Sequence, residues 1–194
     1  MYKEQKFNLP ELKGLSKKSV DEHLKLYAGY VKFSNLINDK MCEYAKDPVA
    51  NAYVMGELQR RFSFEFNGMR NHEYYFKGLE GGAKTLPASS KLKKQIEKQF
   101  GAFENWLAMF KMIALTRGVG WAMLYWDKET KEFTQAWVDE QHLGQLNGLS
   151  LVLGLDMWEH AFYLDFATDK KSYVEAFFNN LNWEVIEDNF KKAL

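Results

Sequence analysis

A carboxylate and an imidazole in the last quarter of the chain have the spacing of a metal-binding pair. The apolar run 149–155 is compatible with a buried strand, and it ends at Asp156. His160 follows four residues later, one turn along a helix that starts there. An oxygen donor and a nitrogen donor that converge in this way suit Mn, Fe or Zn. Asp156 and His160 are therefore candidate ligands, and other parts of the chain must supply the rest.

The composition is that of an ordinary globular protein, with 194 residues of which 46% are apolar and 27% charged. Lysine plus arginine and aspartate plus glutamate number 26 each, so nucleic-acid binding through bulk charge is not expected. No run of residues suggests a membrane span, and the first residues lack the apolar core of a signal peptide. Because Cys42 is the single cysteine, we expect a cytoplasmic protein without an internal disulfide.

Two long helices are predicted in the N-terminal part, because apolar residues recur there at helical spacing. The expected boundaries are a cap at Ser16 or Ser19, an end near Tyr44, a second start at Asp47-Pro48 and an end near Phe76. Two long helices joined by a short turn form an antiparallel hairpin. We therefore expect residues 1–80 to be a helical hairpin domain.

The C-terminal part is predicted to mix helices and strands. Glycine and proline at 81–90 indicate a linker, and residues 91–194 form the second expected domain. The expected helices are 91–99, 103–116, 158–166 and two pieces within 171–194, and the expected strands are 121–126, 133–138 and 149–155. The predicted fold class is α+β: a long antiparallel helical hairpin followed by an α/β lobe with a three-stranded antiparallel sheet.

Histidine is scarce, and a metal site needs several histidines. The four in the chain are His23, His72, His142 and His160. Taken alone, His72 at the end of the second helix is more often a hydrogen-bonded structural residue than a ligand. The sequence around the histidines carries more information than their number.

Four separated motifs resemble those of the iron/manganese superoxide dismutases. The stretch Asp156–Leu164 resembles the signature D-x-W-E-H-A-(F/Y)-Y-L, and Asn71–Phe76 resembles the motif N-H-x-x-(F/Y)-(W/F). The blocks 100–104 and 118–122 resemble F-G-S-F-E and G-S-G-W-A and occur in the same order. The resemblance covers roughly residues 16–190.

This resemblance implies both an activity and a ligand set. The family disproportionates superoxide to oxygen and hydrogen peroxide with one Mn or Fe ion held by three histidines and one aspartate. By the resemblance His72, Asp156 and His160 are three of these ligands, and the fourth comes from the first helix.

The first helix departs from the family pattern H-x-x-x-H-x-x-x-Y-V. An ungapped alignment on Tyr30 places Glu22 at the ligand position, whereas one deletion places His23 there. At about 100° per residue, His23, Tyr27 and Tyr30 form a single stripe on a regular helix, while Glu22 would need an overwide turn. We therefore predict His23 as the fourth ligand, with Glu22 as the alternative.

In the family a glutamine or histidine bonds to the solvent at the metal. Gly68 occupies the helical position for such a residue and cannot donate a hydrogen bond. The alignment upstream of Asp156 selects Gln141, and a one-residue shift would select His142 instead. The combination of Gly68 with Gln141 resembles the manganese type, so the resemblance favours Mn over Fe.

Further residues match the walls of the family's site. Tyr30 matches its active-site tyrosine, which joins the proton relay. Tyr27 stands where the family usually has a second, non-ligand histidine. Trp121 and Trp158 match the aromatic walls that keep the site dry.

Glu159 and Tyr163 resemble residues that cross the family's dimer interface, so a homodimer or a tetramer is expected. Lys25 and Arg70 are candidates for attracting the superoxide anion.

The leading hypothesis is therefore a superoxide dismutase of the Mn/Fe type. The altered first helix motivates an alternative, a degenerate relative whose metal site is structural and which has no dismutase activity. A mononuclear zinc hydrolase is a third reading, but the chain lacks a general base of the H-E-x-x-H kind.

Overall fold

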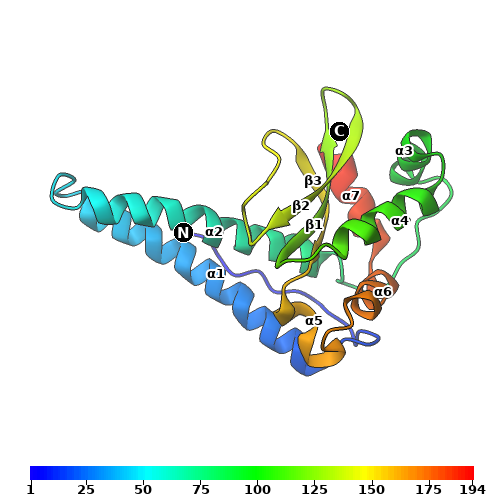
Figure 1. Cartoon of the computed structure of the whole chain (residues 1–194), viewed down its shortest axis with the longest axis horizontal. Helices are drawn as coiled ribbons and strands as arrows, with labels where there is room; N and C mark the ends of the chain where they lie inside the picture. The colour runs from blue at the N-terminus through cyan, green and yellow to red at the C-terminus, as the bar shows by residue number, and fades with distance from the viewer.

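Two long helices form an arm that extends from the rest of the molecule (Figure 1). The computed structural model describes residues 1–194, and the arm consists of α1 (Lys17–Tyr44) and α2 (Ala52–Lys77). The side chain of Ser16 caps α1 by accepting the Ser19 N–H at 3.1 Å. The predicted antiparallel hairpin is confirmed.

The start of the second helix differs from the prediction. α2 begins at Ala52 rather than at Pro48, because the residues before it form the turn that reverses the chain. The Asp47 side chain accepts the Ala50 N–H at 3.1 Å, and its carbonyl accepts the Asn51 N–H at 3.1 Å. Asp47 thus closes a tight turn between the helices instead of capping the second helix.

A three-stranded antiparallel sheet lies beside the inner end of the arm (Figure 1). Its strands are β1 (Gly120–Asp127), β2 (Glu132–Asp139) and β3 (Ser150–Asp156), in the order β2-β1-β3. Trp121 of β1 pairs with Asp156 of β3, so the start of the central strand lies beside the end of β3. β1 is buried along nearly its whole length, as expected for the central strand of a small sheet.

Five shorter helices complete the fold and confirm its α+β class. They are α3 (Lys91–Phe100), α4 (Phe103–Ala114), α5 (Glu159–Phe166), α6 (Lys170–Asn180) and α7 (Trp183–Ala193). α7 packs against β3 and also holds the start of α3. Its buried Glu187 accepts the backbone N–H groups of Lys91 and Leu92 at 3.0 and 3.1 Å.

The first residues run as an extended segment across the helices. Tyr2 exchanges two hydrogen bonds with Asn35 of α1, and the Gln5 N–H bonds to Tyr27 of the same helix. Further along, Lys13 exchanges two hydrogen bonds with Asn180 of α6. Residues 1–15 therefore join the helical arm to the C-terminal part. None of the helices has both the length and the apolar character needed to cross a membrane.

Candidate metal centre

Four side chains from both parts of the chain converge at the junction of the arm and the sheet. His23 comes from α1, His72 from α2, Asp156 from the end of β3 and His160 from α5. Their ligand atoms all lie within 4.8 Å of one another. The Nε2 atoms of His23, His160 and His72 lie 3.1, 3.2 and 3.5 Å from the same Asp156 oxygen, Oδ2.

The donor set fits a redox-active transition metal. The Nδ1 atom of His72 lies 2.6 Å from the Gly68 carbonyl, and because a carbonyl only accepts, Nδ1 carries the proton. The His72 Nε2 atom therefore presents a lone pair, and it is buried without a hydrogen-bond partner. Three imidazole nitrogens and one carboxylate oxygen suit Mn or Fe as well as Zn.

Other groups hold the aspartate in place. Its second oxygen, Oδ1, accepts the Trp158 N–H at 2.8 Å, and its backbone carbonyl accepts the Tyr173 hydroxyl at 2.8 Å. Asp156 is fully buried, so these bonds orient a carboxylate that solvent does not reach. Such contacts behind a ligand fix its geometry toward a metal.

Burial sets the protonation of the ligands. It lowers the pKa of His72 to about 3 and also lowers the pKa of His23, although the Asp156 carboxylate opposes the shift. Burial by itself would raise the pKa of Asp156, but His160 and His23 outweigh it and the pKa of Asp156 is lowered. At neutral pH His23 and His72 are therefore neutral and lie beside a carboxylate, which is the state in which they bind a metal ion.

Glu22, the alternative to His23, lies outside the cluster. It is exposed and pairs with Lys25 at 2.6 Å on the surface of α1. α1 is a regular α-helix throughout, without an overwide turn that would rotate Glu22 inward.

Gln141 connects three residues beside the cluster. Its amide nitrogen donates to the Tyr30 hydroxyl at 3.0 Å, and its amide oxygen accepts the Trp121 indole N–H at 2.9 Å. Asn71, the residue before His72, donates to the Gln141 carbonyl at 3.0 Å. Gln141 is fully buried, so the orientation of its amide is fixed by these partners.

Gly68 allows Tyr30 to pack closely on α2. A Cβ atom at this position would lie 2.6 to 2.9 Å from three atoms of the Tyr30 ring. The ring centroid of Tyr30 is 5.0 Å from that of His72, one turn further along the helix. Besides lacking a donor, Gly68 therefore leaves the space that Tyr30 occupies.

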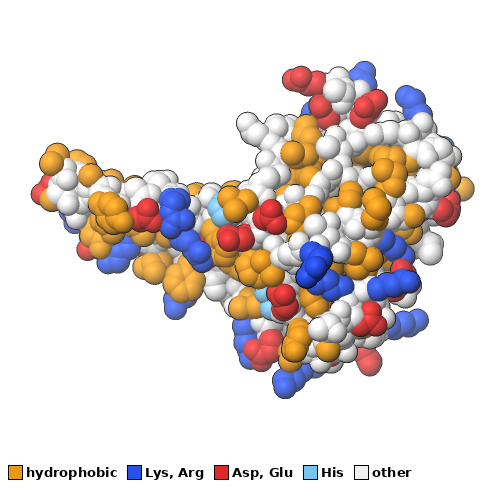
Figure 2. Space-filling view, viewed as in Figure 1, with side chains coloured by type: hydrophobic (Ala, Val, Ile, Leu, Met, Phe, Trp, Pro, Cys, Tyr) orange, Lys and Arg blue, Asp and Glu red, His pale blue; other side chains and the backbone are white.

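Tyr30, His142 and Trp158 surround the Phe64 ring, and we call this side of the site its mouth. The His142 ring is 5.7 Å from the Phe64 ring, and its buried Nδ1 atom has no hydrogen-bond partner. Trp158 is stacked on His160 with an angle of 21° between the rings, and its indole donates to the Glu140 carbonyl at 3.0 Å. Figure 2 shows histidine side chains reaching the surface where the arm meets the rest of the molecule.

Tyr27 lies behind the cluster rather than at its mouth. Its hydroxyl accepts the Gln5 N–H at 2.8 Å and donates to Glu73 at 3.3 Å. Its ring packs against Phe7 and Phe76, and burial raises its pKa to about 12. The structure thus places the Tyr27 hydroxyl toward the N-terminal segment, away from the Gln141–Tyr30 pair.

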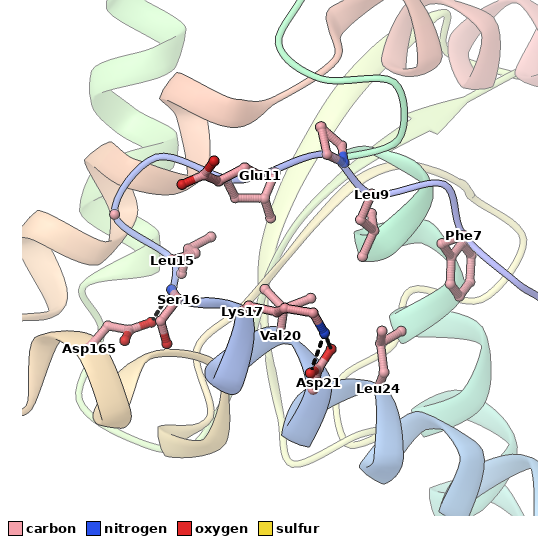
Figure 3. Close-up of a pocket in the computed structure, with 13 residues that line it drawn as sticks. Phe7, Leu9, Glu11, Leu15, Ser16, Lys17, Val20, Asp21, Leu24 and Asp165 are labelled. Atoms are coloured by element: carbon pink, nitrogen blue, oxygen red, sulfur yellow. Dashed lines mark hydrogen bonds and ion pairs between the residues drawn. The ribbon is translucent and has the colours of Figure 1, made fainter.

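A separate cavity of about 950 Å³ lies between the N-terminal segment and the start of α1 (Figure 3). Leu15, Val20 and Leu24 line it together with the ion pair of Lys17 with Asp21. None of the four clustered side chains lines this cavity. The metal centre is a tight, buried cluster and not a large open pocket.

Comparison with known proteins decides the family. Residues 88–189 match the model of the C-terminal domain of iron/manganese superoxide dismutases. The chain is 32% identical over 188 residues to the iron superoxide dismutase of Aquifex aeolicus, covering 94% of this chain and 87% of that protein. The chain belongs to the iron/manganese superoxide dismutase family.

Relatives of the family that are named for other metals are equally similar. The Mn/Fe superoxide dismutase of Aeropyrum pernix is 33% identical over 177 residues, which cover 89% of this chain and 80% of that protein. The manganese superoxide dismutase of Nocardia asteroides is 32% identical over 173 residues, which cover 89% of this chain and 82% of that protein. Overall similarity therefore does not separate Mn from Fe.

Glu159 and Tyr163, which resemble interface residues of the family, lie on the surface of α5 next to His160. Glu159 is exposed, and Tyr163 is 56% exposed. The His160 side chain itself is 20% exposed, so the cluster comes nearest to solvent on this side.

Sequence reasoning missed several residues that support the site. Asn71 and Tyr173 hold Gln141 and Asp156 in place, and Phe64 packs against the residues at the mouth. Asn71 stands next to a ligand in a motif, which is a usable signal, whereas Tyr173 and Phe64 look like core residues. Lys25 and Arg70, the expected cations, pair with Glu22 and Glu73.

Proposed function

We propose that the chain is a superoxide dismutase, which converts two superoxide anions and two protons to one O2 and one H2O2. Its Mn or Fe ion is held by His23, His72, Asp156 and His160. The observation that carries the proposal is the convergence of three Nε2 atoms on one buried carboxylate oxygen, at 3.1 to 3.5 Å. Superoxide is inferred as the substrate because the similar proteins are named superoxide dismutases.

A bound Mn or Fe ion supplies the one-electron oxidation of one superoxide and the one-electron reduction of the next. Asp156 supplies the negative charge that partly balances such an ion. The bond of His72 to the Gly68 carbonyl keeps its Nε2 atom unprotonated. Trp121, Tyr75 and Phe76 are buried around the imidazoles and keep bulk water away from them.

Tyr30 is the proposed catalytic proton donor, and Gln141 positions it. Since Gln141 donates to the Tyr30 oxygen, the hydroxyl proton of Tyr30 stays available for another acceptor. Burial and the Asp156 charge raise the pKa of Tyr30, so the hydroxyl keeps its proton at neutral pH. Peroxide formation consumes two protons, and a protonated Tyr30 at the mouth can pass on one of them.

Separate loading with Mn and with Fe tests the proposal. We expect both forms to remove superoxide, with the Mn form more active, an expectation supported by the pairing of Gly68 with Gln141. A metal-replete sample that is inert in both forms would refute the dismutase proposal and favour the degenerate relative.

The first ligand is tested by two neighbouring variants on α1. We expect His23→Ala to lose the metal on dialysis, because it removes one of the four converging donors. Glu22→Ala is the matched control and should retain the metal, because Glu22 lies on the surface. Metal content is measured by elemental analysis for both variants. The opposite result would show that Glu22 is the ligand instead of His23.

We further propose a homodimer or a tetramer with Glu159 and Tyr163 at the interface, supported by their exposure beside His160. A cytoplasmic location is supported by the single exposed cysteine, Cys42. The proposed division into residues 1–80 and 91–194 is supported by the absence of helix and strand between α2 and α3.

A further inference from the structure

Arg61 lies on the face of α2 that carries the ligand His72. At about 100° per residue, Arg61, Glu65, Gly68 and His72 fall within a stripe roughly 60° wide. Arg70 lies about 160° from His72 on the same helix and pairs with Glu73. The cation of α2 that shares a face with the site is therefore Arg61 and not Arg70.

The Arg61 guanidinium covers a phenyl ring at the mouth of the site. It lies 3.7 Å from the centroid of the Phe64 ring, which is a close cation–π contact. The Phe64 centroid is 6.0 Å from the ring of Tyr30, 5.7 Å from that of His142 and 6.4 Å from that of Trp158. Phe64 thus separates Arg61 from three residues that surround the mouth.

A buried carboxylate lies beside this cation. Glu65 is only 6% exposed, and its Oε1 atom accepts the Arg61 Nε–H at 2.8 Å. The Arg61 side chain is 51% exposed, so the pair is buried at its negative end and open to water at its positive end. Without Arg61, Glu65 would be an uncompensated negative charge near the approach to Tyr30.

The charges of Arg61 and Glu65 also influence the pKa of Tyr30. Burial is the main cause of the raised pKa of Tyr30, and the charge of Asp156 adds to it. Beyond these, Glu65 raises the pKa of Tyr30 and Arg61 lowers it. Glu65 and Arg61 therefore shift the pKa of the Tyr30 hydroxyl in opposite directions, as their opposite charges require.

We propose that Arg61 is a specificity-determining residue for anions. It neutralises the buried Glu65 and covers Phe64, and in this way it prevents the Glu65 charge from repelling small monoanions at the mouth of the metal centre. The inference rests on the proposed function for the identity of the natural anion, which is superoxide. The observations that carry it are the ion pair with a buried carboxylate and the contact with Phe64.

Azide, a small monoanion, is the probe. Its dissociation constant is measured by absorption titration of the metal-loaded protein, in the same buffer for every variant. We expect Arg61→Gln to weaken azide binding about fivefold, because a full charge at the mouth is left uncompensated. Arg60→Gln is the matched control, since Arg60 also pairs with a glutamate, Glu57 at 2.8 Å, on another face of α2.

Removing the carboxylate tests the same point without removing Arg61. We expect Glu65→Gln to tighten azide binding by a similar factor, and the double variant Arg61→Gln/Glu65→Gln to return to within about twofold of the parent. A Glu65→Gln protein with unchanged azide affinity would overturn the proposal, even if Arg61→Gln failed to fold. Equal effects of Arg61→Gln and Arg60→Gln would overturn it as well.

The same titration separates this proposal from the dismutase proposal. A protein that binds azide in an Arg61-dependent way but does not remove superoxide refutes the dismutase function and supports the role of Arg61. An active dismutase whose azide affinity is the same in all four variants keeps its function and overturns the role of Arg61.

Discussion

Gly68 and Tyr30 show how one missing side chain positions another. The Tyr30 ring occupies the space that a Cβ atom at position 68 would need, with contacts of 2.6 to 2.9 Å. The hydrogen bond from Gln141 to Tyr30 depends on this placement. The position of the proposed proton donor is thus set by a residue without a side chain, whose backbone carbonyl also accepts the His72 Nδ1–H.

We expect Gly68→Ala to displace Tyr30 while the metal is retained. Dismutation should fall about tenfold or more, because small misplacements of catalytic groups are costly. Gly56→Ala is the control, since nothing lies within 4 Å of a Cβ atom at that position of α2. Metal content and rate are measured together, and a Gly68→Ala protein with the parent rate would show that Tyr30 does not depend on this packing.

Acid should destabilise the metal-free protein through its buried imidazoles. Burial lowers the pKa of His72 to about 3 and also lowers that of His23, whereas histidines of an unfolded chain titrate near about 6.5. Between these values the unfolded chain binds more protons, so the free energy of unfolding falls as the pH decreases from about 6.5. The lowered pKa of Asp156 affects stability only below about pH 4, the unfolded carboxyl range.

Urea unfolding of the metal-free protein between about pH 4 and 7 measures this effect. We expect the midpoint to fall with pH in the parent and to fall less in His72→Gln, which has one fewer buried imidazole. Parallel pH profiles for the two proteins would contradict the expectation.

Three of the four ligands could be predicted from the sequence because they stand in short motifs that resemble those of the family. His72, Asp156 and His160 are fixed within a few residues of the pattern, and the regular geometry of α1 favours His23 over Glu22. The direction of the Tyr27 hydroxyl could not be predicted, because it depends on where residues 1–15 cross α1.

Among the elements of the fold, the N-terminal segment 1–15 packs on the site at the side away from its mouth. Phe7 packs on Phe76, whose ring centroid is 4.9 Å from that of His23. The Tyr27 hydroxyl bridges the Gln5 N–H of this segment and Glu73 of α2. The extended N-terminal segment thus contacts both ligand helices and stabilises their packing against each other.

We expect Tyr27→Phe to lower the free energy of unfolding by about 1 kcal/mol, because the partly buried Gln5 N–H loses its acceptor. Metal content should be unchanged, because the hydroxyl contacts no ligand. Tyr53→Phe is the control, since Tyr53 is 85% exposed at the start of α2. Equal unfolding midpoints for the two variants would mean that the bridge contributes nothing.

Periodicity predicted the elements well and their ends less well. The antiparallel hairpin and the three strands follow from apolar spacing, and the observed strands differ from the predicted ones by one residue at each shifted end. The start of α2 was misplaced because Asp47-Pro48 has the composition of a helix start as well as of a turn. Which turn forms depends on the antiparallel packing of α1 on α2, which local sequence does not record.

At the scale of the whole molecule, the proposed interface on α5 predicts an assembly. We expect the parent to sediment as a dimer or a tetramer, and Glu159→Ala and Tyr163→Ala to shift it toward a smaller species. Glu184→Ala is the control, because Glu184 lies in the first turn of α7 as Glu159 does in that of α5. A parent that sediments as a monomer at every concentration would contradict the assembly.

The order of the ligands along the chain has a consequence for biosynthesis. The site joins two early histidines to Asp156 and His160, which a ribosome adds much later. A growing polypeptide therefore cannot close the cluster until His160 has been made, and before Asp156 is made an ion would have at most His23 and His72 of these ligands. Metal capture by the complete site is thereby deferred until the edge of the sheet can dock against the two helices.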